Sequence, residues 1–169
     1  MSEGKEPIFR YGETEIQYLK QRDPKLGAII DQIGPIERTV DDDLISAIVH
    51  HIVGMTYKKV EYIEDCARKA ASGELNLKQL PQCSDKEIID QLVSLKGVGV
   101  WTAEMILLFC LQRPDVFSYG DLAILRGLRM VYHHRKIDRK LFEKYRRRFS
   151  PYGSVASLYL WAVASGAVE

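Results

Sequence analysis

The chain has 169 residues, with 24 Lys and Arg against 23 Asp and Glu, and therefore a net charge of +1. Hydrophobic residues make up 46% of it, which is typical of a folded, soluble domain and excludes a disordered chain. No run approaches the roughly 20 apolar residues that a membrane-spanning helix needs, and no apolar signal core follows Met1. We therefore expect a cytoplasmic protein, associated with the nucleoid if it is bacterial.

The charge is distributed unevenly along the chain. Residues 126–148 contain ten basic residues against Asp138 and Glu143, a local charge of +8 that leaves −7 for the remainder. Such segregation is expected of a protein that holds a polyanion on one face. A solvated helix surface would show the same pattern.

Helix signals dominate the first half of the chain, and alternating strand patterns are nearly absent. Asp23 and Pro24 provide an N-cap and a first-turn proline, and Ser84 with Glu87 forms a capping box. Apolar residues recur with the helical period between such signals. We expect helices over 12–22, 24–33, 41–53, 57–71 and 85–96.

The second half continues in the same way. A helix over 100–112 is apolar almost all round and should be central to the core. After a loop over 113–120, the helix from Asp121 to about His133 is expected to turn its leucines inward, Leu122 included. Two further helices over 138–149 and 154–164 close the chain. The expected fold is all-α.

A short turn with two glycines joins two of these helices. Gly97 can adopt the positive φ of a helix C-cap, Gly99 allows a partner to approach the next helix, and Val98 can tuck between the two helices. The amides that open the next helix, at Val100, would point outward toward a phosphate oxygen or toward an ion that bridges to one. Taken alone, the turn is equally well a plain structural corner.

Three segments together resemble one family: LVSLKGVGVWTAEMI (92–106), RPDVFSYGDLAILRGLRMVY (113–132) and SPYGSVASLYLW (150–161). In this order they provide a hairpin, an aspartate one short loop later and a late Pro-aromatic segment. The pattern is similar to the helix–hairpin–helix DNA glycosylases, in the branch that removes alkylated purines such as 3-methyladenine.

The resemblance implies an abbreviated all-α bundle of two small helical lobes around a cleft. We expect one lobe to consist of 1–54 and 137–169. The other, over 55–136, would carry the hairpin and the aspartate loop.

The resemblance implies that Asp121 is the essential carboxylate of the family. Cleavage of an N-glycosidic bond develops an oxocarbenium-like sugar, which a nearby carboxylate stabilises. An aspartate at a helix start is also an ordinary N-cap, and both roles can coincide. Family members that also cut the backbone have a lysine two positions after the second hairpin glycine, where this chain has Trp101. The resemblance therefore implies a monofunctional hydrolase that releases only the base.

Further site residues are implied by the same match. Trp101 and Tyr152 correspond to pocket aromatics that would stack on a flipped-out cationic base, with core packing as the alternative for both. The residues that would hold a DNA phosphate are Lys96, Gly97, Val98, Gly99 and Val100.

The resemblance implies no cofactor, apart from a monovalent cation that would bridge the hairpin to a DNA phosphate. The four histidines stand in two adjacent pairs and the three cysteines in no metal-like spacing, so no metal site is predicted. The expected partner is double-stranded DNA with alkylated bases, bound by a monomer.

The family pattern breaks after Gly54, which runs almost directly into Met55. Relatives have two or three further helices there, about forty residues at usual lengths, which also supply the side chain that wedges into the DNA. Either other residues replace the wedge, or activity is weak, or the chain is a shortened form. Apolar surface exposed by the gap would favour a dimer.

Two other functions fit the same residues. One is a non-catalytic helix–hairpin–helix module that binds DNA by phosphate contacts alone. The other is a helical interaction protein that offers its basic segment to an acidic partner.

Overall fold

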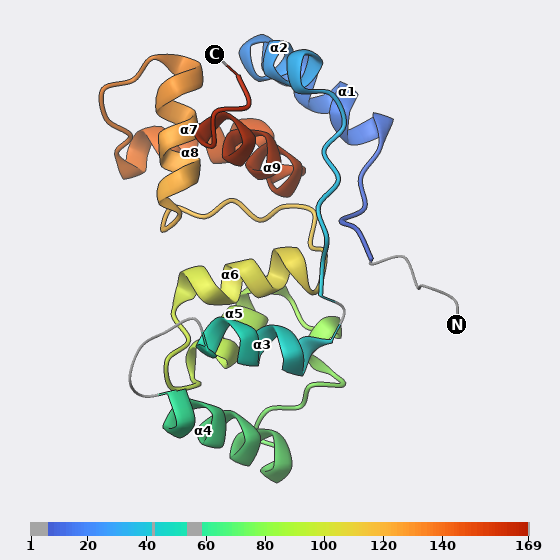
Figure 1. The fold of residues 1–169 in the computed structure, drawn as a ribbon, viewed down its shortest axis with the longest axis vertical. Helices are drawn as coiled ribbons and strands as arrows, with labels where there is room; N and C mark the ends of the chain where they lie inside the picture. The colour runs from blue at the N-terminus through green and yellow to red at the C-terminus, as the bar shows by residue number, and fades with distance from the viewer. Residues whose placement is uncertain (1–6, 42, 54–58, 169) are drawn as a thin grey trace. The chain divides into compact units, whose positions relative to one another are not determined.

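The structure, a computed structural model, describes residues 7–41, 43–53 and 59–168. None of these residues forms a strand longer than one residue, so the all-α prediction is confirmed. The α-helices (Figure 1) are α1 (Glu13–Arg22), α2 (Pro24–Ile33), α3 (Leu44–Val53), α4 (Lys59–Ser72), α5 (Asp85–Val93), α6 (Val100–Phe109), α7 (Leu122–Tyr132), α8 (Arg139–Phe149) and α9 (Gly153–Ala164). A single 3₁₀ turn, η1 (Leu80–Gln82), precedes α5.

The predicted helices are confirmed, and their ends differ by a few residues where local hydrogen bonds decide them. α3 begins at Leu44 because the Asp43 side chain accepts a hydrogen bond from the Ile45 amide at 3.1 Å. α6 ends at Phe109 with Cys110 as its C-cap residue, and Gln112, the predicted last residue, adopts the left-handed region with φ 49°. The junction of Gly54 with Met55 lies outside the described residues.

The helices separate into two compact units. Unit 1 combines Met1–Pro7 with Thr39–Gln112, and unit 2 combines Ile8–Arg38 with Arg113–Glu169. This division differs from the expected lobes, 1–54 with 137–169 and 55–136. The reason is packing: α3 lies against α4 and α6, which draws it to the hairpin helices, whereas α7 lies mainly against α9, which draws it to the end of the chain.

The core of unit 1 is built around α6. Its buried side chains include Ala103, Ile106 and Leu108, none of which is exposed. Ile88 and Leu92 of α5 are equally buried, and α5 packs on α6. The central position predicted for the apolar 100–112 segment is confirmed. No helix of the described residues is both long and apolar enough to cross a bilayer.

The core of unit 2 centres on the crossing of α7 and α9 (Figure 1). Glycine permits this close crossing, because a Cβ at Gly127 would collide with the backbone carbonyl of Leu160. An aromatic group fills the neighbouring space: Phe117 stacks on Phe142 at 4.9 Å between ring centroids and meets Phe149 edge-on at 5.5 Å.

One predicted core residue of unit 2 is not in the core. Leu122 was expected inward, but its side chain is 81% exposed, while Ile124 and Leu128 are fully buried. Leu122 precedes Leu128 by six residues, which at 3.6 residues per turn places it about 120° around the helix from Leu128. The correction matters because Leu122 directly follows Asp121.

We predict that Gly127→Ala destabilises the protein. Alanine normally gains about 1 kcal/mol over glycine inside a helix, but the clash with Leu160 should reverse this and lower the free energy of unfolding by about 1–3 kcal/mol. Gly27→Ala in α2 is the matched control, since its Cβ would meet Lys20 Cα at 3.2 Å and should cost less. Denaturant unfolding of both variants tests this order, and equal stability would contradict the close crossing.

Candidate functional site

The turn with two glycines joins α5 to α6 within unit 1. Gly97 has φ +80°, the left-handed conformation that the sequence predicts for it. It is not the C-cap of the helix, however, because α5 ends at Val93 and its C-cap residue is Ser94. Val98 is buried, and its amide donates to the Leu95 carbonyl at 3.2 Å. The hairpin is therefore present as predicted.

The N-terminus of α6 is open to approach. Gly99 is its N-cap residue and offers no side chain to cap the helix, and nothing lies within 4 Å of where its Cβ would stand. Val100 is 54% exposed and Trp101 44% exposed. Such an end attracts an anion, because first-turn amides point outward and the helix dipole is positive there.

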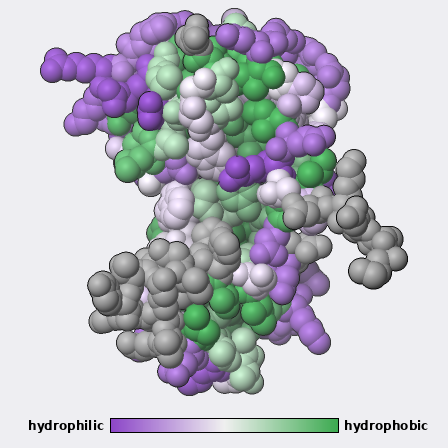
Figure 2. Space-filling model, in the orientation of Figure 1, coloured by the Kyte–Doolittle hydropathy of each residue, from purple (hydrophilic) through white to green (hydrophobic). Residues whose placement is uncertain are grey.

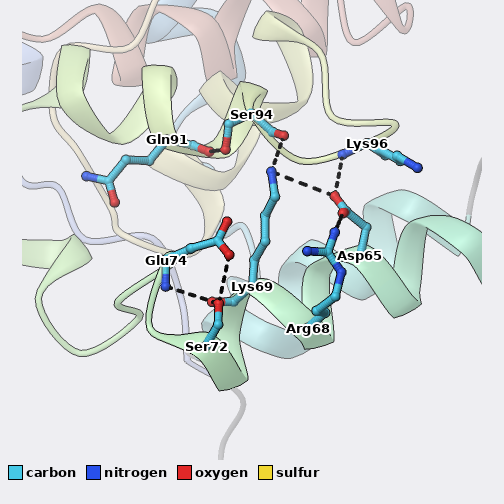
Figure 3. A network of polar contacts seen from close by, with 8 residues as sticks. All are labelled: Asp65, Arg68, Lys69, Ser72, Glu74, Gln91, Ser94 and Lys96. Atoms are coloured by element: carbon cyan, nitrogen blue, oxygen red, sulfur yellow. Dashed lines mark hydrogen bonds and ion pairs between the residues drawn. The ribbon is translucent and has the colours of Figure 1, made fainter.

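Side chains of α4 hold the turn in place (Figure 3). Asp65 accepts a hydrogen bond from the Lys96 amide at 3.2 Å and is paired with Arg68. Lys69, one turn further along α4, donates to the Ser94 carbonyl at 2.6 Å. The segment that follows α5 is thus tied to α4 at Ser94 and at Lys96.

The Tyr62 ring and the charge of Asp65 also help to hold the turn in place. The Tyr62 ring occupies the place that a Cβ at Gly97 would need, so the turn and α4 fit only with glycine there. The hydrogen bond from the Lys96 amide, with the nearby cations, lowers the pKa of Asp65 below its ordinary value. Asp65 is therefore bound more strongly as a carboxylate than as an acid.

In unit 2, the loop that leads to Asp121 is anchored to the start of α9. Asp115 accepts hydrogen bonds from the Ser150 hydroxyl at 2.6 Å and from the Gly153 amide at 3.1 Å. A Cβ at Gly153 would come within 2.8 Å of Asp115 Oδ1. The carboxylate can reach the amide closely because Gly153 has no side chain.

A second anchor is the Ser154 hydroxyl. It donates to the Arg113 carbonyl at 2.5 Å and accepts from the Val116 amide at 2.9 Å. Ser157, one turn along α9, donates to the Val116 carbonyl at 3.1 Å. These buried bonds fix the backbone of the loop shortly before Asp121.

Asp121 is the N-cap residue of α7. Its Oδ1 accepts hydrogen bonds from the amides of Ala123 and Ile124, both at 2.9 Å, and the residue is 6% exposed. The capping role that sequence alone suggests is real, and it orients the carboxylate rigidly.

Comparisons with known proteins find similar sequences and similar folds. DNA-3-methyladenine glycosylase 1 of Schizosaccharomyces pombe is 34% identical over 110 residues, 64% of this chain and 48% of the relative. DNA-3-methyladenine glycosylase of Bacillus subtilis is 32% identical over 112 residues, 66% of this chain and 37% of the relative. The chain thus spans less than half the length of these relatives. No protein-family model matches it.

Solved structures agree with the sequence relatives. DNA-3-methyladenine glycosidase of Bacillus halodurans superposes with a TM-score of 0.77 at 26% identity, covering 95% of this chain and 94% of that one. The chain is thus similar in sequence and in fold to helix–hairpin–helix DNA glycosylases named for 3-methyladenine. The 3-methyladenine DNA glycosylase of S. pombe in complex with abasic DNA shares the fold, with a TM-score of 0.75 at 22% identity over 92% of this chain and 98% of that one.

The helix–hairpin–helix residues and the aspartate lie in different units of this glycosylase fold. Trp101 belongs to unit 1 with the hairpin, and Tyr152 to unit 2 with Asp121. Tyr152 is half-buried and meets Tyr18 edge-on, with ring centroids 5.2 Å apart. Tyr18 also donates to the Ser150 carbonyl at 2.7 Å, so this one side chain contacts the segment that carries Tyr152 at two points.

The basic residues of the 126–148 segment differ in what they contact. Arg148 is structural: it donates to the buried carboxylate of Asp23 at 2.7 Å, a bond that raises the pKa of the guanidinium. Arg139 pairs with Glu143 at 2.9 Å. The remaining basic residues of the segment are exposed, namely Arg126, Arg129, Arg135, Lys136, Lys140, Lys144, Arg146 and Arg147. Figure 2 shows hydrophilic side chains gathered around the α7–α8 connection.

Sequence reasoning missed the residues that support the site. Asp65, Asp115 and Ser154 act on backbone groups between 31 and 41 positions away, so no local pattern marks them. Among the described residues, no group of three or more His, Cys, Asp or Glu side chains could hold a metal ion, and no disulfide forms.

We predict that Gly97→Ala and Gly99→Ala differ sharply in stability. At Gly97, alanine meets both the positive φ, which costs about 1–2 kcal/mol, and the Tyr62 ring. At Gly99, with φ −91° and open space, the change should stay within about 1 kcal/mol. Thermal unfolding measures both, and similar melting temperatures would refute this turn geometry.

We predict that Asp65 stabilises the fold in a pH-dependent way. Because folding lowers its pKa, its contribution is present above the ordinary value of 3.8 and is lost as the pH falls below that value through the folded-state pKa. Asp65→Asn should therefore melt below the wild type at pH 7, with the gap closing in acid. Asp90→Asn, which removes an exposed pair with Lys86, should show little gap at either pH. A gap for Asp65→Asn that is constant with pH would contradict the assignment.

Proposed function

We propose that this chain is a monofunctional glycosylase that hydrolyses the N-glycosidic bond of alkylated purines, of the 3-methyladenine type, in double-stranded DNA. The observation that carries the proposal is the Asp121 carboxylate, which two backbone amides hold in place. The resemblance in sequence implies that this residue is the essential aspartate of the family. The relatives named DNA-3-methyladenine glycosylases support the substrate class.

Hydrolysis of this N-glycosidic bond requires from the protein mainly a negative charge close to the sugar. Water forms a bond to C1′ of the sugar, the glycosidic bond breaks, and its electron pair leaves with the purine, whose positive charge it neutralises. A water proton passes to solvent. Asp121 stabilises the positive charge that develops on the sugar and orients the water. Because an alkylated base is already a good leaving group, no strong general acid is required.

Each unit has one aromatic side chain that we propose for stacking on an extruded base. Trp101, which is 44% exposed, offers a face that attracts a cationic purine by about 0.5–2 kcal/mol. Tyr152, braced by Tyr18, offers a second ring near the start of α9. Neither residue can form a Schiff base, and for this reason we propose release of the base without cleavage of the strand.

The hairpin would bind the DNA backbone. The first-turn amides of α6 and the open space at Gly99 suit a phosphate oxygen. Lys96 to Val100 contain no carboxylate, so any ion bound there would be held by backbone carbonyls. A monovalent cation that bridges to the phosphate fits this ligand set. We propose no other cofactor, and a monomer as the active species.

We predict that Asp121→Asn lowers the rate of 3-methyladenine release from methylated duplex DNA by at least about 100-fold, while DNA affinity stays within twofold of the wild type at the same salt concentration. Asparagine caps a helix as well as aspartate does, so the fold should persist. Borohydride should trap no adduct with the wild type.

The matched control is Asp138→Asn. Asp138 caps α8 by accepting the Leu141 amide at 2.8 Å, so this variant removes the same charge from an equivalent cap without touching the proposed chemistry. Its rate should equal that of the wild type. If the wild type binds DNA but releases no base, the chain is a non-catalytic binding module instead.

A further inference from the structure

The loop that leads to Asp121 also caps α9. The first four amides of a helix have no acceptor within the helix, and at α9 the loop supplies acceptors for two of them. The Asp115 carboxylate accepts from the Gly153 amide at 3.1 Å. The Pro114 carbonyl accepts from the Ser154 amide at 3.0 Å. The backbone before Asp121 is therefore bound to the start of a helix that is itself mostly buried.

Ser154 contacts this loop with its hydroxyl as well as with its amide. The hydroxyl donates to the Arg113 carbonyl at 2.5 Å and accepts from the Val116 amide at 2.9 Å. The residue is fully buried, so these partners are not shared with bulk water. Alanine in its place would leave the buried Val116 amide without this acceptor, which is a costly loss. The hydroxyl of Ser154 thus restricts the loop backbone as far along as Val116.

The short stretch between Val116 and Asp121 is restrained by aromatic packing. Phe117 stacks on Phe142 of α8 with ring centroids 4.9 Å apart. Tyr119 meets the same Phe142 ring edge-on at 5.1 Å. A displacement of the backbone at Val116 would therefore be passed on to Asp121, because the residues between them are not free to absorb it.

We propose that Ser154 is a positioning residue for the proposed hydrolysis. Its hydroxyl fixes the loop so that the Asp121 carboxylate lies where positive charge develops on the sugar. The proposal rests on the proposed function. Misplacement of a reacting group by about 1 Å can cost about 100-fold in rate, whereas contacts with DNA phosphates do not depend on the place of this carboxylate. Ser154 therefore acts on the rate of base release and not on the affinity for DNA.

The test compares Ser154→Ala with Tyr11→Phe. Tyr11 is the matched control because its hydroxyl also bridges two backbone groups of unit 2: it donates to the Ile36 carbonyl at 2.9 Å and accepts from the Ile36 amide at 2.7 Å. Both variants should lower the melting temperature, because each removes such a bridge.

Single-turnover release of 3-methyladenine from methylated duplex is measured well below both melting temperatures. Ser154→Ala should release the base at least about tenfold more slowly than the wild type, and Tyr11→Phe should stay within about twofold of it. The affinity of both variants for unmethylated duplex should stay within about twofold of the wild type at the same salt concentration.

A second comparison shows whether Ser154 acts through Asp121. Residues that act as one unit are not additive in their effects on rate. In the Asp121→Asn background, Ser154→Ala should therefore slow release by less than about twofold further. A general weakening of the fold would instead slow release by the same factor with and without the carboxylate.

Ser157→Ala decides the case if Ser154→Ala does not fold. Ser157 donates to the Val116 carbonyl at 3.1 Å, so its loss loosens the loop while the bonds of Ser154 remain. Release should then slow about threefold, again only with Asp121 present. An unchanged rate, or equal slowing with and without Asp121, would overturn the positioning role and leave the proposed function standing. If the wild type releases no base, the proposed function fails, and the positioning role fails with it.

Discussion

The hydrogen bonds between the 113–118 loop and the first turn of α9 are the constraint on which unit 2 depends. The Ser154 hydroxyl forms hydrogen bonds with one carbonyl and one amide of the loop. Asp115, which belongs to the loop, accepts a hydrogen bond from the Gly153 amide at the start of α9. Because buried polar groups are costly when unpaired, the loop is restricted to a conformation that keeps these partners. Asp121 follows the loop and Tyr152 precedes α9, so the same bonds position both.

In unit 1, too, a carboxylate holds a turn by accepting a hydrogen bond from a backbone amide. The segment after α5 leaves the helical ladder, and its backbone needs partners from elsewhere. Asp65 of α4 accepts the Lys96 amide, as Asp115 accepts the Gly153 amide in unit 2. In each unit a carboxylate from a distant element holds a turn next to a proposed functional residue. Each turn is thereby held by a hydrogen bond from outside its own segment.

The two helices that begin at these turns differ in their caps, and the difference matches their proposed roles. α6 starts at Gly99, which offers no capping side chain, so its first turn suits an anion from outside. α7 starts at Asp121, which supplies its own anion to the helix. One helix start is therefore suited to bind a phosphate, and the other to present a fixed carboxylate to a developing cation. Both are followed by an exposed apolar residue, Val100 and Leu122.

The sequence by itself determined the helices, the hairpin and the capped aspartate, because caps, left-handed glycines and apolar periodicity act over a few neighbouring residues. The predictions for Gly97 and for the start of α7 needed no distant contact. Tertiary structure alone decided which helices share a unit, which carboxylates hold the turns, and that Leu122 faces away from the core. These depend on packing between segments far apart in the chain. The packing decides which face of α7 is buried, and Leu122 lies outside that face.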